Sequence, residues 1–504
     1  MDPAYSRFEW RDTGRGTWVR DADEPEIFYT SIAKFWEASG RSFFHMTGHL
    51  SLKVAVPGPQ SQASVGQKLD AALAKAWLAL RSHHPAIAAQ VHFDPEGGGK
   101  FVKEYRLSAS GWLEETFIRH SSSQSGVDFA NSDPPAPPMP TLNVLAPPSE
   151  DASVVLRDLV FRSPHDIIDG IGTLLLFDNY VRLAAEAFGK GDSYEPPSLD
   201  DPALIKNLSP PFRVAANIPA EPSDAIKQRL KDIEAADKAD SPDVEDVVLP
   251  YRKGAVVPGV HKRVELTLPP EQTAKLTQAC KDLGASVTHV FHAALALTLR
   301  DLQEKAPAPR PVRYVGYLLR NERPRCVPPY NGHQHPTGVY HSTSAEKLVV
   351  EMTVPGRDGD SPTAETQRSD FLRVVGQMRD FYTAVRDDRE HYALAPHLWA
   401  RGTPALPPAG EKPLTVPPPS ESPSATISSM GRIDGIIAHR HGAIEVYSPW
   451  VTGEELRSGL GLFLGTFRGE LSLSVAYNDA WHDSESAIGF LRRCMDIVHF
   501  GLGV

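Results

Sequence analysis

The sequence predicts a mixed α/β fold, and three observations support this prediction. Segments with the two-residue period of strands alternate with segments that have the 3.6-residue period of helices. The 504 residues are 41% hydrophobic and 23% charged, which is typical of globular proteins. A chain of this length can bury a large core, and at about 150 residues per domain it predicts two to four domains.

The first regular elements are an amphipathic helix and a hairpin. Apolar side chains spaced three and four residues apart between Leu69 and Leu80 lie on one helical face, and Pro85 should end this helix. A hairpin follows over 88–107, because two strand-like runs flank the glycine-rich segment 94–100. This segment predicts a turn rather than a phosphate-binding loop, since it lacks the Lys-Ser/Thr ending and the helix that such a loop requires.

A sharp corner between a buried strand and a long helix is the clearest local feature. The apolar run 154–162 predicts a strand, which should end at Ser163-Pro164. An amphipathic helix is expected to begin near Asp169 and to continue to Phe188, with Gly189 as its stop.

Polar and proline-rich segments divide the chain. The segments 130–149 and 403–423 are rich in proline and predict irregular structure. The stretch 192–250 is polar, with a charged, helix-like piece at 222–239. We therefore expect a linker or crossover between two halves in this stretch.

The second half repeats the alternation of strands and helices. Gly284 suits the left-handed end of one helix, and Thr288 suits the N-cap of the next. Strands are expected at Val264–Leu268, 313–319, 425–429, 443–447 and 470–477, and helices at 270–283, 288–303, 364–387, 453–467 and 483–500.

The charge balance excludes two classes of partner. Lysine and arginine number 52 against 63 aspartates and glutamates, so the net charge is −11. A nucleic-acid binder needs a basic footprint, and so does a protein that attaches to an anionic membrane surface. No run of about 18 apolar residues predicts a membrane span. We expect neither a nucleic-acid partner nor a membrane partner.

Cysteine use and histidine spacing give no clear metal site. The three cysteines are far apart, which fits free thiols in a reducing compartment, and the start of the chain has no apolar leader. We expect a cytoplasmic protein. His333 and His335 form an HxH pair with His341 nearby, but no third ligand has a suitable spacing. This loop is therefore either solvated or substrate-facing, and no metal is predicted.

The motif H-x-x-x-D-G at His165, Asp169 and Gly170 is the strongest candidate for chemistry. A histidine at a strand end can project into a cleft, and its ordinary pKa near 6.5 lets it take and return a proton. Asp169 can fix the corner by capping or ion pairing, and Gly170 can permit a turn or a close approach. The alternative interpretation is a surface or core histidine followed by ordinary helix-start residues.

The chain resembles the HxxxD acyltransferases, which include chloramphenicol acetyltransferase, the plant BAHD enzymes and peptide-synthetase condensation domains. The motif block FRSPHDIIDGIGTLLLFDNY (161–180) is similar to their active-site segment. Four other blocks occur in the same order: the early helix with its His-Pro ending (69–87), the helix pair 276–299, the "n-x-R" strand VGYLLRNERP (315–324) and the closing strand and helix 467–486. The closest similarity is to fungal trichothecene-type O-acetyltransferases.

This resemblance implies a fold and a domain organisation. Two chloramphenicol-acetyltransferase-like halves, each a mixed sheet flanked by helices, would enclose an active-site channel. The implied boundaries are 1–200 for the half that carries the motif, 201–255 for the linker and 256–504 for the second half. A monomer is expected.

The resemblance also implies a reaction. His165 would act as general base for an acceptor hydroxyl that attacks an acyl thioester, with acyl-CoA as co-substrate and no bound cofactor. Asp169 would pair with an arginine, for which Arg320 matches the "n-x-R" position. Ser428 or Ser429, in SSMGRIDG (428–435), would donate to the oxyanion. The plant D-F-G-W-G signature is absent, so no CoA contacts are transferred from it.

Three alternatives remain open at this stage. The donor could be a thioester on an acyl carrier protein, as in condensation domains. The pocket could catalyse a cyclisation or isomerisation without acyl transfer. The chain could also be a binding module without catalysis, although the intact motif argues against this.

Overall fold

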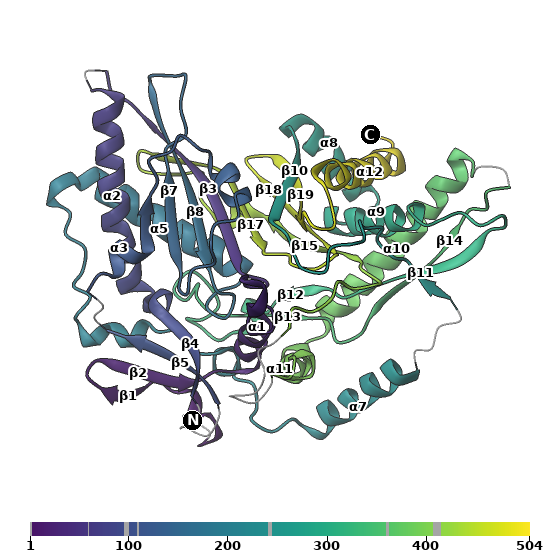
Figure 1. The fold of residues 1–504 in the computed structure, drawn as a ribbon, viewed down its shortest axis with the longest axis horizontal. Coiled ribbons are helices and arrows are strands. Elements are labelled where there is room, and N and C mark those ends of the chain that lie inside the picture. The colour runs from purple at the N-terminus through teal and green to yellow at the C-terminus, as the bar shows by residue number, and fades with distance from the viewer. Residues whose placement is uncertain are drawn as a thin grey trace.

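The computed structural model describes residues 3–58, 60–94, 100–107, 110–239, 244–358, 362–406 and 415–504. Two lobes lie side by side, each with a β-sheet and packed helices (Figure 1). Each lobe has its own cluster of buried apolar side chains. The mixed α/β prediction is confirmed.

The first lobe is built on a six-stranded sheet with the order β16-β17-β3-β8-β7-β6. Two long helices, α2 (Gln62–His83) and α5 (Gly170–Lys190), pack against the buried apolar face of this sheet. The strands are β3 (Met46–Ala55), β6 (Phe117–Arg119), β7 (Thr141–Leu145), β8 (Val154–Ser163), β16 (Arg440–His441) and β17 (Ile444–Gly453).

Strand β17 crosses from the C-terminal part of the chain into the first lobe. It pairs antiparallel with β3, and β16 pairs with β17 at the edge of the same sheet. In Figure 1 this late segment lies beside the early strand β3. The two lobes therefore do not divide into two uninterrupted stretches of sequence.

The second lobe contains a four-stranded sheet with the order β10-β19-β18-β15 and a three-stranded sheet with the order β14-β11-β9. Its strands are β9 (Glu245–Asp246), β10 (His261–Leu268), β11 (Arg310–Gly316), β14 (Leu348–Val354), β15 (Ala425–Arg432), β18 (Leu460–Phe467) and β19 (Glu470–Asn478). Its helices are α8 (Pro270–Asp282), α9 (Val287–Asp301), α10 (Ala364–Asp387) and α12 (Ser484–Leu502).

Smaller elements complete the fold around the lobes. One sheet has the order β1-β2-β5-β4, and β12 pairs with β13. The strands of this sheet are β1 (Arg11–Gly14), β2 (Thr17–Asp21), β4 (Ala89–Asp94) and β5 (Lys100–Arg106). The separate two-stranded pair consists of β12 (Leu319–Asn321) and β13 (His341–Thr343). The remaining α-helices are α1 (Glu24–Phe35), α3 (Trp112–Thr116), α4 (Gly126–Asn131), α6 (Phe212–Ala215), α7 (Asp224–Ala239) and α11 (His391–Gly402).

The predicted helix over 453–467 is wrong. The chain instead completes β17 and then forms β18, in which Leu460, Leu462 and Leu464 alternate into the core of the second lobe. The two-residue period of these leucines outweighs the helical period that the sequence also allows.

Two caps also differ from the prediction, and one predicted turn stays untested. Helix α9 is capped by Ser286 rather than Thr288, and α5 ends at Gly191 rather than Gly189. The centre of the predicted hairpin turn, 95–99, lies outside the described residues.

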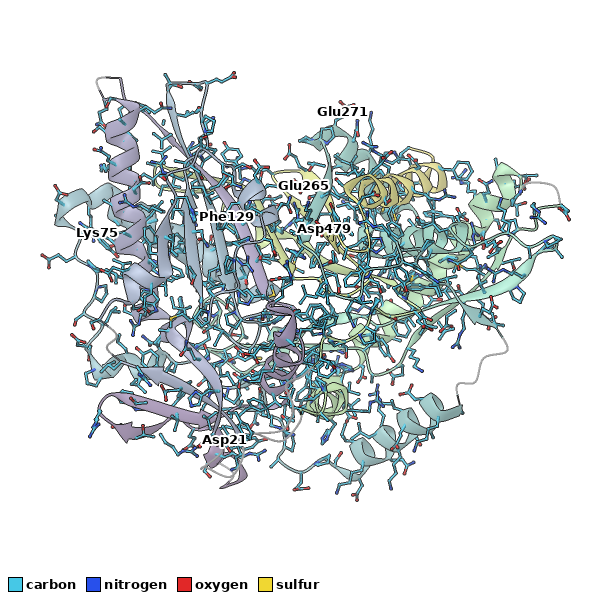
Figure 2. All side chains as sticks on the ribbon, in the orientation of Figure 1. Asp21, Lys75, Phe129, Glu265, Glu271 and Asp479 are labelled. Carbon is cyan, nitrogen blue, oxygen red and sulfur yellow. The ribbon has the colours of Figure 1, made fainter. Side chains whose placement is uncertain are left out.

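The second face of the first sheet meets the second lobe. Asn131 of α4 exchanges two hydrogen bonds with the backbone of Arg263 in β10, at 3.0 and 2.7 Å. Figure 2 labels Phe129 of α4 and Glu265 of β10 on the two sides of this boundary. The two lobes are therefore in direct contact between α4 and β10.

Candidate active site

The fold places His165 at the corner between β8 and α5, as the sequence predicts. Strand β8 lies between β3 and β7 within its sheet and ends at Ser163. Pro164 then breaks the strand, and Ile167 N–H donates to the Pro164 carbonyl at 3.3 Å to close a turn. His165 therefore sits on a short loop between two well-packed elements.

Asp169 anchors this loop from within the protein. Its side chain caps α5 by accepting a hydrogen bond from Gly172 N–H at 2.7 Å, and Tyr340 N–H donates to its other oxygen at 2.8 Å. Arg323 Nη1 lies 2.8 and 2.9 Å from the two carboxylate oxygens. Burial acts to raise the pKa of Asp169, but Arg323 and His341 hold it well below its ordinary value. Asp169 therefore remains charged and fully bonded.

The predicted pairing of Asp169 with Arg320 is wrong, because Arg323 is the partner. Arg320 points away and donates to the backbone carbonyls of Val385 and Asp388, at 2.5 and 3.0 Å, near the end of α10. Unpaired carbonyls at a helix end are natural acceptors for a guanidinium. Strand β12 ends at Asn321, and the turn that follows directs Arg323 toward the corner.

The close approach predicted at Gly170 occurs at Gly172 instead. A Cβ on Gly170 would make ordinary contacts, the nearest at 3.4 Å to Val451. A Cβ on Gly172 would lie 2.3 Å from the carbonyl oxygen of Pro336 and 2.7 Å from Arg323 Nη2. Gly172 is thus the position where only glycine fits, and it lets the loop before β13 lie against α5.

The ring of His165 is enclosed by aromatic side chains. Tyr29 of α1 stacks on it with ring centroids 3.7 Å apart and an angle of 7°. The Tyr29 hydroxyl is bonded to Nε2 of His341 at 2.8 Å, and the other ring nitrogen of His341 lies 3.8 Å from Asp169. Trp399 of α11 packs its ring edge-on against His341. Three distant segments therefore meet at His165.

His165 is kept neutral by this environment. Burial and the neighbouring His341 lower its pKa to about 3, although its own backbone carbonyl and Asp169 act to raise it. Within the described part of the chain, no other residue gives Nδ1 a hydrogen-bond partner. A neutral imidazole can accept a proton, which is what a general base requires.

A buried network of charges supports the loop from the N-terminal side. Lys103 donates to the carbonyl of Asp166 at 2.9 Å and to Glu26 at 2.7 Å, and Glu26 also binds Arg20. Thr30 donates to the Asp166 carboxylate at 2.6 Å. Burial raises the pKa of Asp166 to about 6 against the opposing effect of Lys103. These residues hold the backbone next to His165.

Sequence reasoning missed most of these supporting residues. Glu26 had a local signal, because Asp23 and Glu26 form a capping box at the start of α1. His341 was treated only as part of a histidine-rich loop. Tyr29, Thr30 and Lys103 reach the site only through tertiary packing, so no local sequence pattern predicts their position there.

Ser428 and Ser429 lie on β15, and Ser429 contacts the first turn of α9. The two serines are half-buried, and the Ser429 hydroxyl is bonded to the Thr288 hydroxyl at 2.9 Å. The next residue, Met430, would be 3.5 Å from a Cβ on Gly170. Their role as oxyanion donors stays a prediction.

A narrow groove of about 90 Å³ runs between the lobes near this corner. Strand β17 forms one side, and the sheet of β10, β15, β18 and β19 forms the other. Its lining includes Arg263, Met430, Tyr447, Trp450, Val451 and Arg468. Met430 and Val451 are also the nearest neighbours of a Cβ built on Gly170, whereas His165 is not among the residues that line the groove.

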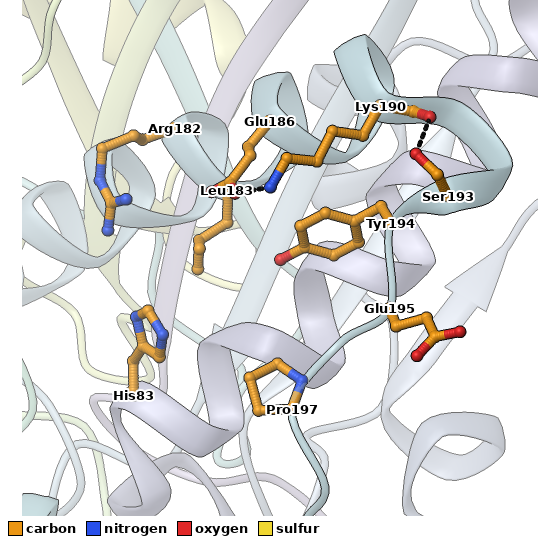
Figure 3. A pocket seen from close by; sticks show the side chains of 9 residues that line it. All are labelled: His83, Arg182, Leu183, Glu186, Lys190, Ser193, Tyr194, Glu195 and Pro197. Atoms are coloured by element: carbon orange, nitrogen blue, oxygen red, sulfur yellow. Dashed lines mark hydrogen bonds and ion pairs between the residues drawn. The ribbon is translucent and has the colours of Figure 1, made fainter.

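A larger depression of about 380 Å³ lies far from this chemistry (Figure 3). It is lined by residues near the end of α5, among them Arg182, Glu186 and Lys190, with Glu186 and Lys190 paired at 2.7 Å. At 1.5 Å per residue, the lining residues of α5, from Arg182 to Lys190, are about 20 to 30 Å from Asp169. This depression takes no part in the site.

The histidine-rich loop does not gather metal ligands. His335 lies 3.2 Å from the Ser209 hydroxyl, His333 faces Asp178, and His341 belongs to the site around His165. Among the described residues, no group of three or more His, Cys, Asp or Glu side chains could hold a metal ion. No described helix is both long and apolar enough to cross a membrane.

Comparisons with known proteins agree with this architecture. No protein-family model matches the chain. It is 23% identical to acetyltransferase pigO of Monascus ruber, over 98% of both chains. It is 25% identical to O-acetyltransferase pigM of the same organism, over 98% of this chain and 87% of that protein.

Solved structures share the fold. Trichothecene 15-O-acetyltransferase TRI3 of Fusarium sporotrichioides has a TM-score of 0.77 at 17% identity, covering 99% of this chain and 98% of that one. The first condensation domain of the CDA synthetase has a TM-score of 0.59 at 13% identity, covering 95% of each chain. The chain is thus a homologue of fungal acetyltransferases and shares the two-lobed fold of TRI3 and of condensation domains.

Proposed function

We propose that this protein transfers an acyl group, acetyl or another short chain, from acyl-CoA to a hydroxyl of a small secondary metabolite. One observation carries the proposal: a neutral histidine, His165, lies on a corner fixed by the buried Asp169–Arg323 pair. Two relatives that align over nearly the whole chain are named as acetyltransferases, which supports the same reaction class.

His165 takes the acceptor proton in this proposal. We assign the basic lone pair to Nε2 and the proton of the neutral ring to Nδ1. The acceptor oxygen attacks the thioester carbon, its proton moves to Nε2, and the carbonyl electron pair moves to oxygen. When the carbon–sulfur bond breaks, the departing thiolate takes the proton back. General base catalysis of this kind contributes roughly 10²–10⁴-fold.

Asp169 and Arg323 hold the base rather than share its chemistry. The Asp169 carboxylate is saturated by Arg323, Gly172 and Tyr340, so it is occupied in fixing the loop. Ser428 and Ser429 on β15 are the oxyanion donors that the sequence resemblance implies. The groove between the lobes would lead one substrate toward the corner, since Met430 and Val451, two neighbours of Gly170, line it.

A direct test compares the protein with its His165→Ala variant on a panel of acyl-CoA donors and hydroxylated acceptors. We expect acylated product from the native protein and a loss of most turnover in the variant, with an unchanged melting temperature. An equally active variant would remove His165 from the mechanism.

A donor carried on a protein is the second candidate, because the fold is also that of condensation domains. Turnover with acetyl-CoA and with acetyl-loaded carrier protein separates the two. We expect free acetyl-CoA to be the better donor. A preference for the loaded carrier would favour the second candidate.

A further inference from the structure

His45 is a second buried histidine close to His165, and none of the described residues forms a hydrogen bond with its ring. The residue is 2% exposed, and within the described ranges neither Nδ1 nor Nε2 is bonded to any group. Buried polar atoms in folded proteins nearly always have partners, so two unpaired nitrogens on one ring require an explanation. A ligand that is bound only during the reaction would provide one.

The strand register places His45 on the sheet face that meets the second lobe. Met46 pairs with Ser163 in the neighbouring strand, so His45 lies beside Pro164, one residue before His165. Met46 and Leu50 point into the core of the first lobe, and successive strand residues alternate between faces. His45 therefore lies on the opposite face, together with Arg162.

The surroundings keep the ring of His45 neutral. Burial, the positive charge of Arg162 and the neighbouring His165 hold its pKa well below the ordinary value. A neutral imidazole carries one N–H donor and one acceptor nitrogen. His45 is thus an N–H donor that stays uncharged at neutral pH, with a guanidinium close by.

The backbone before His45 is strained and firmly held. Phe44 has a φ of 58°, which is uncommon for a bulky residue. Phe44 N–H donates to the Glu454 carbonyl at 3.0 Å, and Glu454 N–H donates to the His45 carbonyl at 2.8 Å. Strained residues cluster at functional sites, where the surrounding structure holds them in place.

Resting on the acyl transfer proposed above, we propose that His45 contacts the substrate and donates a hydrogen bond to the acyl oxygen as the tetrahedral intermediate forms. The carbon–oxygen bond to the acceptor forms, the carbonyl electron pair moves to that oxygen, and the acceptor proton goes to His165. The His45 N–H stabilises the new negative charge, and the nearby cation is Arg162, whose Nη2 lies 3.1 Å from the Glu454 carboxylate. When the carbon–sulfur bond breaks, the electron pair returns to the carbonyl and the thiolate takes the proton from His165.

This role suits His45 better than a second base would. His165 already serves as proton acceptor, whereas an unpaired N–H is what a developing oxyanion needs. The competing donors are Ser428 and Ser429, and the Ser429 hydroxyl already has the Thr288 hydroxyl as a partner.

The test compares His45→Phe and His45→Gln in the full-length protein. Phenylalanine fills the ring volume without polar atoms, and glutamine supplies an amide N–H. We expect His45→Phe to fold at least as stably as the native protein and to lose about 10²–10³-fold in kcat with little change in KM, as when one oxyanion donor is removed. His45→Gln should recover part of this loss.

A buried histidine of the second lobe, with both ring nitrogens bonded, serves as the matched control. His292 in α9 is bonded to the hydroxyls of Tyr314 and Tyr382, at 2.9 and 3.1 Å. His292→Phe should lower the melting temperature and leave kcat near the native value, the reverse of the pattern expected for His45→Phe.

The outcomes separate this inference from the function on which it rests. Failure of the native protein to transfer or hydrolyse any thioester, free or carrier-bound, overturns the proposed function. A native protein with turnover and a fully active His45→Phe variant overturns only the role of His45. Equal losses of kcat in His45→Phe and His45→Gln would also overturn the role of His45. Failure of both variants to fold would overturn it as well. A larger loss in Ser428→Ala or Ser429→Ala, with His45→Phe unaffected, would assign the oxyanion to the serines.

Discussion

The phenol ring of Tyr29 lies flat against the imidazole of His165, with centroids 3.7 Å apart and 7° between the ring planes. A helix from the start of the chain thus fixes a ring on the loop that follows β8. Burial disfavours the imidazolium that forms when His165 takes a proton. An aromatic face attracts a cation, so this stack favours the charged form at the step where it is needed.

Replacing Tyr29 should separate the effect of its ring from that of its hydroxyl. Tyr29→Leu removes the stack, and we expect kcat to fall about 2- to 30-fold, which corresponds to the 0.5–2 kcal/mol of a cation–π contact. Tyr29→Phe keeps the ring and loses only the bond to His341, so its kcat should fall less. Steady-state kinetics at saturating donor measure both variants. Equal losses would assign the effect to the hydroxyl.

Arg323 and Arg320 should differ in their coupling to Asp169. Arg323→Met leaves a buried carboxylate without its cation, which typically costs about 3–5 kcal/mol of unfolding free energy. Asp169→Asn in the same background should recover part of that loss, because it removes the stranded charge. Urea unfolding of the two single variants and the double variant gives the coupling energy.

Arg320→Met is the control for this cycle. Its bonds go to backbone carbonyls and to Glu322, whose pKa is already raised by burial. Its effect should therefore add to that of Asp169→Asn without coupling. Coupling at Arg320, or additivity at Arg323, would contradict the pairing that the structure assigns.

The sequence predicted the strand, the corner and the capped helix because each depends on local rules. The apolar run before Ser163, the break at Pro164 and the carboxylate at Asp169 are all visible along one stretch of chain. Which arginine pairs with Asp169 depends on the direction of the turn after β12, and the spacing of apolar residues does not predict that direction. The "n-x-R" block contains Asn321-Glu322-Arg323 in full, so a stricter match to that pattern would have selected Arg323.

The aromatic enclosure of His165 could not be predicted in this way. Tyr29 comes from α1, whereas His341 and Trp399 come from β13 and α11, more than 300 residues later in the chain. The three side chains meet only through tertiary packing. The helix predicted over 453–467 was wrong for another reason, because the leucines of this segment fit both a helical and a strand period. Pairing of β18 with β15 and β19 decides between the two.

Stability should fall as the pH decreases below about 6.5. Burial contributes to lowering the pKa of four histidines to about 3, namely His84, His165, His261 and His292. Between that value and the ordinary pKa near 6.5, the unfolded chain binds more protons at these sites, so acid favours unfolding. Asp166 and Glu454 act oppositely, because burial raises their pKa values to about 6 and about 7.

Among the described residues, burial lowers the pKa of eleven histidines and raises that of five carboxyl groups, so the net effect is destabilisation. Each excess proton bound by the unfolded chain costs about 1.4 kcal/mol per pH unit. Urea unfolding at pH 7.5 and 5.5 measures this slope, and His292→Phe should make it shallower by removing one of the four groups. A stability that is constant or that rises toward pH 5.5 would contradict these assignments.

Gly172 and Gly170 provide a matched pair for the packing at the corner. A methyl group at Gly172 would lie 2.3 Å from a backbone oxygen of Pro336, which cannot move aside as a flexible side chain can. Gly172→Ala must therefore shift the loop that carries Pro336, and with it the Arg323 guanidinium that binds both Pro336 and Asp169. We expect a loss of about 1–3 kcal/mol in unfolding free energy, as for other overpacked sites, together with reduced turnover.

Gly170→Ala meets its nearest neighbour at an ordinary 3.4 Å and lies in the first turn of α5, where alanine is favourable, so its stability should stay within about 0.5 kcal/mol of native. Thermal and urea unfolding of both variants check this difference, and an equal cost at the two positions would show that the close approach at Gly172 is not what holds the corner.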